Sequence, residues 1–151
     1  MYLIMDIYSR KIVGWEVHER ESADLSAILA EETLLKEKAE GLVKIVHSDN
    51  GSPMKGATML ATLQRLGVMP SFSRPSVSND NPYSESLFKT MKYVPEYPKE
   101  GLKSLEEAKE WVKKFVEWYN KEQLHSGIKY VTPESRHCGE ERRILEKRVL
   151  L

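Results

Sequence analysis

Two carboxylates in this sequence have neighbours that suit a role in chemistry. Asp49 ends an apolar run, residues 42–46, that predicts a buried strand, and the turn-forming pair Asn50-Gly51 follows it at once. Glu85 lies just inside a predicted helix that opens at Pro82, and thirty-five residues (50–84) separate the two acids. An acid at the carboxyl edge of a sheet and an acid on a neighbouring helix can together ligate a cation such as Mg²⁺.

Taken alone, the two acids allow two interpretations. In the first, both carboxylates ligate a divalent cation. In the second, Asp49 caps the turn at Asn50-Gly51 and Glu85 is a solvated group on a helix surface, as most acidic residues are. On these two residues alone the second interpretation is favoured, so the decision depends on the surrounding motifs.

Two lysines follow Glu85 at helical spacing. Lys89 and Lys92 come four and seven residues after Glu85, so the three side chains share one face of the predicted helix. Each lysine presents a point charge that can reach a phosphate. A solvated lysine is an equally open interpretation for Lys89, whereas we favour the phosphate role for Lys92. Arg74, in the polar loop before the helix, is a further candidate for phosphate contact.

Hydrophobic patterns predict the elements of the first half of the chain. Residues 2–8 and 11–18 are two β-prone runs that predict an antiparallel hairpin around Ser9-Arg10. Ser22 is the predicted N-cap of a helix that ends near Gly41. The residues expected on the buried stripe of that helix are Leu25, Ile28, Leu29 and Leu35. The residues expected to bury the strand before Asp49 are Leu42, Val43, Ile45 and Val46.

The second half alternates helices with polar connections. Residues 57–66 predict a short helix closed by Gly67, residues 68–73 a strand, and residues 74–82 a mobile loop rich in Ser, Asn and Pro. The helix that carries Glu85 stops before Pro95.

A long amphipathic helix and a charged helix are predicted towards the C-terminus. Ser104 to Glu107 form a capping box that opens the long helix. Its expected inner stripe is Leu105, Ala108, Val112, Phe115 and Tyr119, and Trp111 and Trp118 are interpreted as core residues. A loop is expected from Asn120 to Pro133, and a charged helix from Glu140 to Leu151.

Four motifs occur in order along nearly the whole chain. They are Asp6-Ile-Tyr-Ser-Arg-Lys-Ile-Val-Gly-Trp15, His47-Ser-Asp-Asn-Gly51, Ser78-Asn-Asp-Asn-Pro-Tyr-Ser-Glu-Ser-Leu-Phe88, and Tyr119-Asn120 through His125-Ser126 to Thr132-Pro133. Together they resemble the catalytic core of Asp-Asp-Glu transposases and retroviral integrases, and in particular the integrase-like transposases of bacterial insertion sequences.

The resemblance implies a fold and a chemistry. The expected fold is α/β, a ribonuclease-H-like mixed sheet flanked by helices. The expected catalytic and metal-ligating residues are Asp49 and Glu85, with Mg²⁺ or Mn²⁺ as the cofactor, and the expected DNA contacts are Lys89, Lys92 and Arg74. In-line transfer at a phosphodiester can use two such ions, about 3.5–4 Å apart, on the attacking and leaving oxygens.

The resemblance also locates the acid that the family carries on its first strand. Asp6 matches the Asp of the family's second strand, so it is expected to hold Arg10 or the hairpin turn in preference to a metal. The family's first strand and first catalytic Asp are then expected before Met1, which leaves the two-ion site incomplete. His125 is expected to pack locally, and an approach to the site is the alternative.

Composition sets wider limits. The 151 residues are 40% apolar and 30% charged with a formal net charge of zero, so the overall charge gives no argument for a polyanionic partner. No apolar run has the length of a membrane span, and the one cysteine, Cys138, suits a reducing bacterial cytoplasm. We expect a catalytic core over residues 1–137, incomplete at its N-terminus, and a helical extension over 138–151 that is cut off in mid-pattern.

The function expected from this sequence is metal-dependent DNA strand cleavage and strand transfer by a transposase or integrase core. Its partners would be transposon ends and target DNA, with a homodimer possible and no membrane. The alternative is a catalytically inert remnant that binds DNA or self-associates. The missing first acid leaves open whether these residues act as an enzyme.

Overall fold

The computed structural model describes residues 1–38, 44–77 and 80–150, which divide into two compact units. Unit 1 comprises residues 1–2 and 18–101, and unit 2 comprises residues 3–17 and 102–151. Among the helices of the described residues, none combines the length and apolar character needed to cross a membrane.

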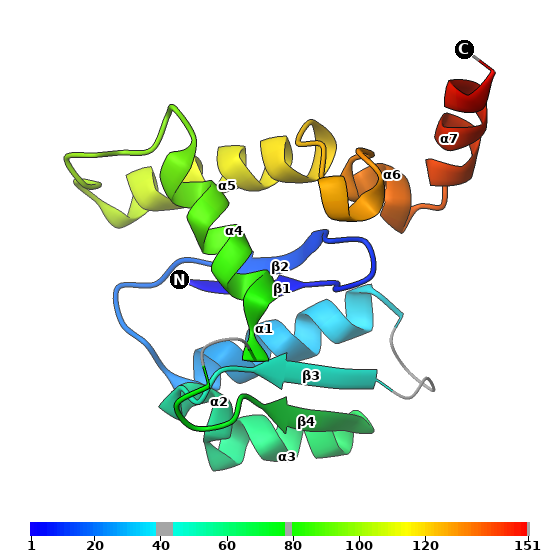
Figure 1. The fold of residues 1–151 in the computed structure, drawn as a ribbon. Coiled ribbons are helices and arrows are strands. Elements are labelled where there is room, and N and C mark those ends of the chain that lie inside the picture. Colours follow the sequence, from blue (N-terminus) through cyan, green and yellow to red (C-terminus); the bar gives the residue numbers. More distant parts are fainter. Residues whose placement is uncertain (39–43, 78–79, 151) are drawn as a thin grey trace. The chain divides into compact units, whose positions relative to one another are not determined.

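Unit 1 is built from helices and one pair of strands (Figure 1). Its elements are α1 (Ala23–Lys36), β3 (Lys44–Ser48), α2 (Ser52–Lys55), α3 (Ala57–Arg65), β4 (Val68–Phe72) and α4 (Pro82–Tyr93). Strands β3 and β4 run parallel, and Asp49 directly follows the last residue of β3. Parallel strands have their carboxyl ends at the same edge of the sheet. Residues 49–51, which follow β3, and the loop that follows β4 therefore both begin at that edge.

Local signals set the helix boundaries of unit 1. The Ser22 hydroxyl caps α1 by accepting from the backbone N–H of Asp24, as predicted. Helix α3 ends where predicted, with Gly67 at a φ of 69°, a conformation that favours glycine. Pro82 opens α4 in its first turn, where a missing N–H costs nothing.

The buried face of α1 differs from the prediction. Ile28 and Leu35 are half exposed, whereas the buried face consists of Ser26, Ala27, Leu29, Ala30 and Thr33. Helix α1 packs against α3, whose Met59 and Leu63 are almost fully buried. Four of the five buried side chains of α1 are small, so hydrophobicity alone did not select its buried face. The helix ends at Lys36, and the predicted end near Gly41 lies outside the described residues.

The prediction that the strand before Asp49 is buried is wrong at Ile45. That side chain is 63% exposed, and its register partner on β4, Met69, is 58% exposed. Register partners lie on the same face of a sheet. Helix α3 contacts β4, and covering one face of a two-stranded sheet leaves alternate side chains on the other face open. Leu42 and Val43 lie outside the described residues.

Unit 2 consists of a hairpin and the C-terminal helices. Its elements are β1 (Tyr2–Met5, whose Tyr2 belongs to unit 1), β2 (Ile12–Glu16), α5 (Leu105–Lys121), the 3₁₀-helix η2 (Ser126–Ile128), α6 (Pro133–His137) and α7 (Glu141–Val149). The predicted hairpin is confirmed, because β1 pairs with β2 and a six-residue connection is too short for a parallel crossover. The described strands therefore form two separate pairs, β1–β2 and β3–β4, where one mixed sheet was expected.

Helix α5 supplies the core of unit 2. Its N-cap is Ser104, whose hydroxyl accepts from the N–H of Glu107, and the Glu107 carboxylate accepts from the N–H of Lys103. Val112, Phe115 and Tyr119 are buried as predicted, together with Val116 and Asn120. The predicted loop from Asn120 to Pro133 is wrong in part, because η2 forms within it, and α6 was not predicted. Both are too short to show a hydrophobic period.

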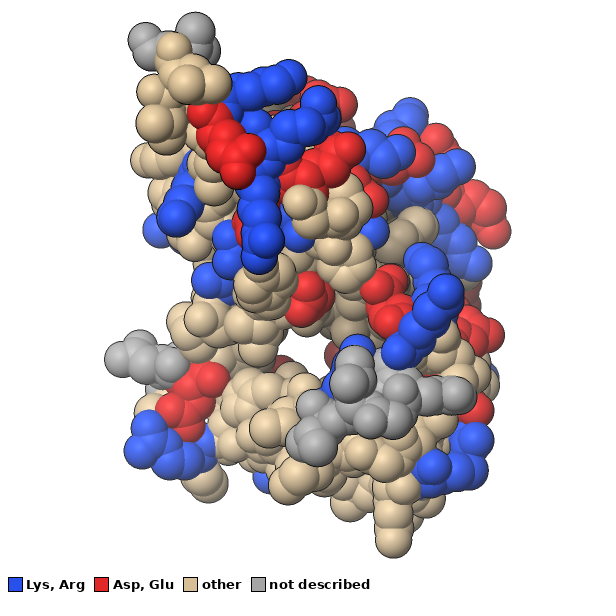
Figure 2. Space-filling model, turned by 90° about the vertical axis from the view of Figure 1, so that its right-hand side faces the viewer, with Lys and Arg blue, Asp and Glu red and all other residues tan. Residues whose placement is uncertain are grey.

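Figure 2 shows the charged side chains on one face of the molecule. On the face drawn in Figure 2 they lie next to one another and form no separate patches of one sign. This agrees with the zero formal net charge.

Candidate functional site

A groove in unit 1 brings together Asp49 and Glu85. Three segments line it: the end of β3, the loop after β4, and one face of α4. The lining residues are Asp49, Asn50, Ser73, Arg74, Ser76, Val77, Asn81, Ser84, Glu85, Phe88, Lys89, Lys92 and Tyr93. Asp49 and Glu85 therefore line the same groove, whereas their assignment as one catalytic site stays a prediction.

Side-chain hydrogen bonds hold the ends of β3 and β4 together beside Asp49. The His47 ring contacts the hydroxyls of Ser71 (2.9 Å) and Ser73 (3.4 Å) through its two nitrogens. The Asn50 amide donates to the Ser73 carbonyl at 2.7 Å, and the Ser73 N–H donates to the Ser48 carbonyl at 3.0 Å. Sequence reasoning gave Asn50 only a place in the predicted turn and assigned no separate role to His47, although both belong to the His-Ser-Asp-Asn-Gly motif.

The Asp49 carboxylate is exposed and oriented by the backbone. Its Oδ1 accepts a hydrogen bond of 2.9 Å from the N–H of Gly51. No described residue donates to Oδ2. The turn-capping role that was weighed against metal binding is real, but it engages only one of the two oxygens. A single carboxylate can therefore serve both roles.

Helix α4 presents Glu85, Lys89 and Lys92 to the groove from one face. Leu87 and Met91 are buried and anchor α4 to the rest of the protein. The spacing of these two sets is that of an amphipathic helix, so the sequence pattern correctly placed the three charged groups together.

Arg74 lines the groove but is paired with a neighbour. Its guanidinium donates to both carboxylate oxygens of Asp80 (2.8 and 3.0 Å), and its N–H donates to Asp80 as well (2.7 Å). The hydrogen bonds from the Arg74 side chain, followed by that from its backbone, lower the pKa of Asp80 to about 2. The expected DNA contact by Arg74 thus has a competing partner, since the pair closes the loop between β4 and α4.

The donor set of the groove fits a hard divalent cation. Mg²⁺ prefers oxygen ligands and is bound by one or two carboxylates while keeping several waters. Asp49 offers Oδ2 and Glu85 offers an exposed carboxylate on the facing element. Across residues 1–38, 44–77 and 80–150, no cluster of three or more His, Cys, Asp or Glu side chains is arranged to hold an ion.

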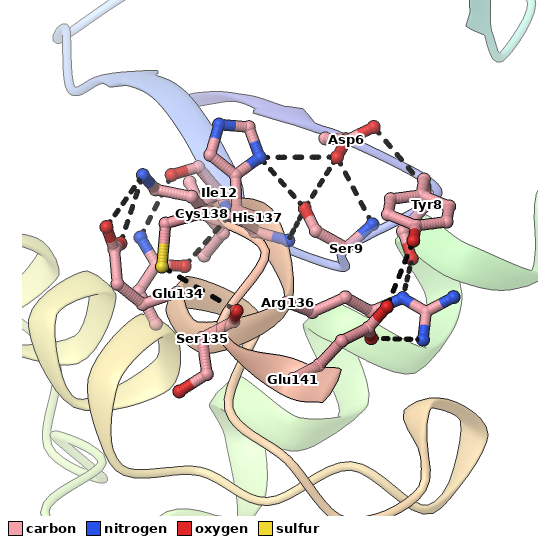
Figure 3. Close-up of polar contacts among 12 residues, drawn as sticks. Asp6, Tyr8, Ser9, Ile12, Glu134, Ser135, Arg136, His137, Cys138 and Glu141 are labelled. Atoms are coloured by element: carbon pink, nitrogen blue, oxygen red, sulfur yellow. Dashed lines mark hydrogen bonds and ion pairs between the residues drawn. The ribbon is translucent and has the colours of Figure 1, made fainter. Parts of the chain in front are cut away.

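Asp6 belongs to unit 2, where it stabilises the hairpin turn (Figure 3). Its carboxylate accepts from the N–H groups of Tyr8 (3.3 Å) and Ser9 (3.2 Å) and from the buried Ser9 hydroxyl. His137 Nδ1 lies 3.4 Å from the same carboxylate. Burial raises the pKa of Asp6, but the hydrogen bonds from Ser9, Tyr8 and His137 outweigh it, so the net shift is downward. The expectation that Asp6 holds the turn is confirmed.

The C-terminal helices clamp the same turn (Figure 3). Arg136 donates to the Tyr8 carbonyl (2.9 Å) and to Glu141 (2.6 Å), and its guanidinium lies 4.2 Å from the Tyr8 ring centroid. Lys11 and Glu134 form an ion pair of 3.0 Å. Glu141 lies beyond the boundary predicted at residues 137/138, which stays a prediction.

The motif from Asn120 to Pro133 has structural roles in unit 2. The buried Asn120 amide pairs with the N–H (2.9 Å) and the C=O (3.0 Å) of Ile12, as a neighbouring strand would. The Thr132 hydroxyl caps α6 by accepting from the N–H of Ser135, and the buried Pro133 opens that helix. The His125 ring packs edge-on against Tyr119, with the ring centroids 4.7 Å apart. The local packing expected for His125 is thus observed.

His125→Phe is expected to weaken the pH dependence of stability. His125 Nε2 is buried with no hydrogen-bond partner among the described residues. Burial, and then the charge of Arg10, lower the pKa of His125 below 6.5. A lowered pKa means that the folded state favours the neutral ring. The stability that the neutral His125 ring contributes is therefore fully present above its pKa in the unfolded state, and it is lost as the pH falls through its pKa in the folded state. The urea-derived free energy of unfolding should therefore fall less between about pH 7.5 and 5 in the variant. Equal falls in both proteins would contradict this.

Comparisons with known proteins identify the family of this chain. An integrase core domain model matches residues 1–78, and a second integrase core domain model matches residues 66–133. The transposase for insertion sequence element IS904 of Lactococcus lactis is 34% identical over 133 residues, covering 86% of this chain and 51% of that protein. Transposase InsF for insertion sequence IS3A of Escherichia coli is 30% identical over 133 residues, covering 87% of this chain and 46% of its own length.

Solved structures share the fold at low sequence identity. The catalytic core domain of BIV integrase has a TM-score of 0.62 at 17% identity, with 95% of this chain and 88% of that chain covered. A chain of the simian T-cell lymphotropic virus intasome in complex with PP2A regulatory subunit B56 gamma has a TM-score of 0.68 at 13% identity, with 89% and 46% covered. The chain spans about half the length of the transposases it matches. With its ribonuclease-H-like integrase-core fold, the chain belongs to the integrase core domain family, alongside the transposases of bacterial insertion sequences.

Proposed function

We propose that this chain carries the metal-binding part of a DNA strand-cleavage and strand-transfer site of the transposase and integrase type. The observation that supports this most directly is that Asp49 and Glu85 line one groove together with Lys89 and Lys92. The matching relatives are transposases for insertion sequences, which supports DNA as the substrate.

Each group in the groove has a distinct part in this proposal. Asp49, through Oδ2, and Glu85 would hold Mg²⁺ or Mn²⁺. When bound, such a cation stabilises the negative charge that develops on the attacking and leaving oxygens of a phosphodiester. Lys89 and Lys92 neutralise backbone phosphates and so orient the strand along α4. The Asn50 and His47 hydrogen bonds keep the strand ends, and with them Asp49, in place.

Asp6 lies outside the proposed ligand set, because its carboxylate is already engaged by Ser9, Tyr8 and His137. The family's first acid, on a strand before Met1, is proposed as the remaining ligand. A longer version of the chain that includes those residues should then bind two ions where residues 1–151 bind one. Equal stoichiometry in the two proteins would contradict this arrangement.

The alternative is a catalytically inert module that binds DNA or self-associates. The engagement of Asp6 in the hairpin turn favours it, because the groove then has two acids to offer. The two functions differ in one measurement, the nicking of supercoiled plasmid by the chain with Mg²⁺ or Mn²⁺. Nicking that Glu85→Gln abolishes supports the cleavage site. DNA binding without nicking, in the longer version as well, supports the inert module.

Lys92→Ala is expected to weaken DNA binding equally for unrelated sequences. A lysine that neutralises one phosphate adds about 0.9 to the slope of log K against log salt concentration on B-DNA, so the variant should lose about that much. Lys109→Ala, an exposed lysine on α5, is the matched control and should leave the slope unchanged. Fluorescence anisotropy over a salt series measures both. A loss of affinity for one sequence only would contradict a phosphate role.

A further inference from the structure

The residue after Asn50 is in unusually close contact with the proposed metal ligand. The Gly51 N–H donates to Asp49 Oδ1 at 2.9 Å. A Cβ atom built on Gly51 would lie 2.9 Å from that same Oδ1. Real Cβ atoms essentially never approach a heavy atom to less than 3.0 Å, so any side chain here would force a shift.

The requirement for glycine at this position is steric. Gly51 has a φ of −57° and a ψ of 139°, a conformation open to all residues. The usual reason for a glycine in a turn, a positive φ, therefore does not apply. What matters is the missing Cβ, which leaves room for the Asp49 carboxylate to lie against the backbone.

The Asp49 carboxylate is the group that would move. The next-nearest atoms to the added Cβ are Asp49 Cγ and Pro53 Cδ, both at 3.8 Å, which is ordinary van der Waals contact. The conflict thus involves only the end of a short side chain, which can rotate away, and leaves the backbone and the core undisturbed. Rotation breaks the hydrogen bond from Gly51 and turns both carboxylate oxygens.

We infer that Gly51 is a positioning residue for metal binding. It holds Asp49 Oδ1 against its own N–H and so keeps Oδ2, which no described residue engages, available to a cation. A fixed carboxylate loses less conformational freedom when it binds an ion than a rotating one does. This inference rests on the proposed function, in which Asp49 is a metal ligand.

Gly51→Ala tests the inference, with Gly127→Ala as the matched control. An added Cβ at Gly127 meets only the end of the Arg10 side chain, at 3.8 Å, so the control makes the same substitution without the conflict. Mn²⁺ affinity, measured by electron paramagnetic resonance of the free ion, should fall about tenfold in Gly51→Ala, the lower end of what loss of an outer-shell partner costs. Gly127→Ala should bind as the wild type does, and circular dichroism should show both variants folded.

A double-mutant cycle shows whether Gly51 acts through Asp49. In an Asp49→Ala background, which has no carboxylate to displace, Gly51→Ala should cause no further loss of Mn²⁺ affinity. An additional tenfold loss there, or unchanged affinity of Gly51→Ala in the wild-type background, would overturn the inference. If the wild-type chain binds no Mn²⁺, the proposed metal site itself is wrong. If the wild type binds Mn²⁺ and Gly51→Ala binds it equally well, only the inference about Gly51 is wrong.

Discussion

Asp49→Asn and Glu85→Gln are each expected to reduce the affinity for Mn²⁺ by at least about tenfold, since even second-shell partners of metal ligands are worth about 10- to 100-fold. Both substitutions keep the shape of the side chain and remove one anionic oxygen donor. An asparagine at position 49 can still accept the hydrogen bond from Gly51, so the turn after β3 should survive. The loss therefore reports ligation and not folding.

The measurement is a Mn²⁺ titration by electron paramagnetic resonance or calorimetry, followed by plasmid nicking wherever the wild type nicks. Asp24→Asn and Glu106→Gln, at acidic residues in the first turns of α1 and α5, are the matched controls and should bind Mn²⁺ as the wild type does. Retention of wild-type affinity by both groove variants would remove Asp49 and Glu85 from the ligand set. Loss in only one variant would leave the other acid without a metal role.

Asn120→Ala is expected to lower the free energy of unfolding by about 2–6 kcal/mol, because it leaves two buried polar groups unpaired and each costs about 1–3 kcal/mol. Asn120 is 6% exposed and Ile12 is 3% exposed, so water does not readily replace the lost amide. The substitution leaves both the N–H and the C=O of Ile12 without their partner. The effect should therefore exceed that of an ordinary surface substitution.

Urea unfolding measures the change, and hydrogen exchange locates it. The Ile12 amide should lose its protection in Asn120→Ala, since its acceptor is gone. Gln123→Ala is the matched control: its amide donates only to the adjacent Leu124 carbonyl, and its removal should change stability by no more than about 0.5 kcal/mol. Continued protection of the Ile12 amide in Asn120→Ala would contradict the role assigned to Asn120.

The structure gives the motif residues of the chain two kinds of task. The His47 to Gly51 motif and the helix that carries Glu85 form the groove, whereas Asn120, His125 and Thr132 hold unit 2 together. The resemblance to integrase-like transposases did not distinguish these tasks. Their contacts did, because the polar side chains of Asn120 and Thr132 are hydrogen-bonded inside unit 2 and the His125 ring packs against Tyr119.

The sequence by itself was sufficient for features that depend on neighbours along the chain. Ser22 and Ser104 cap helices because their hydroxyls reach N–H groups two or three residues away. Glu85, Lys89 and Lys92 face one groove because the helical repeat places them together. The order of the motifs was enough to identify the family, which the matched domain models confirm.

Features that depend on distant partners were decided by the tertiary structure alone. Ile28 and Leu35 are as apolar as Leu29, yet they are half exposed, whereas Leu29 is buried together with small residues of α1. The sequence predicted Arg74 to be available for phosphate contact, but in the structure its guanidinium is hydrogen-bonded to the Asp80 carboxylate. The Asn50-Gly51 pair predicted a turn, but the steric need for glycine at position 51 depends on the orientation that the Asp49 carboxylate takes in the folded chain. Burial, pairing and steric room are properties of the packed chain, and no local sequence signal encodes which atoms will meet.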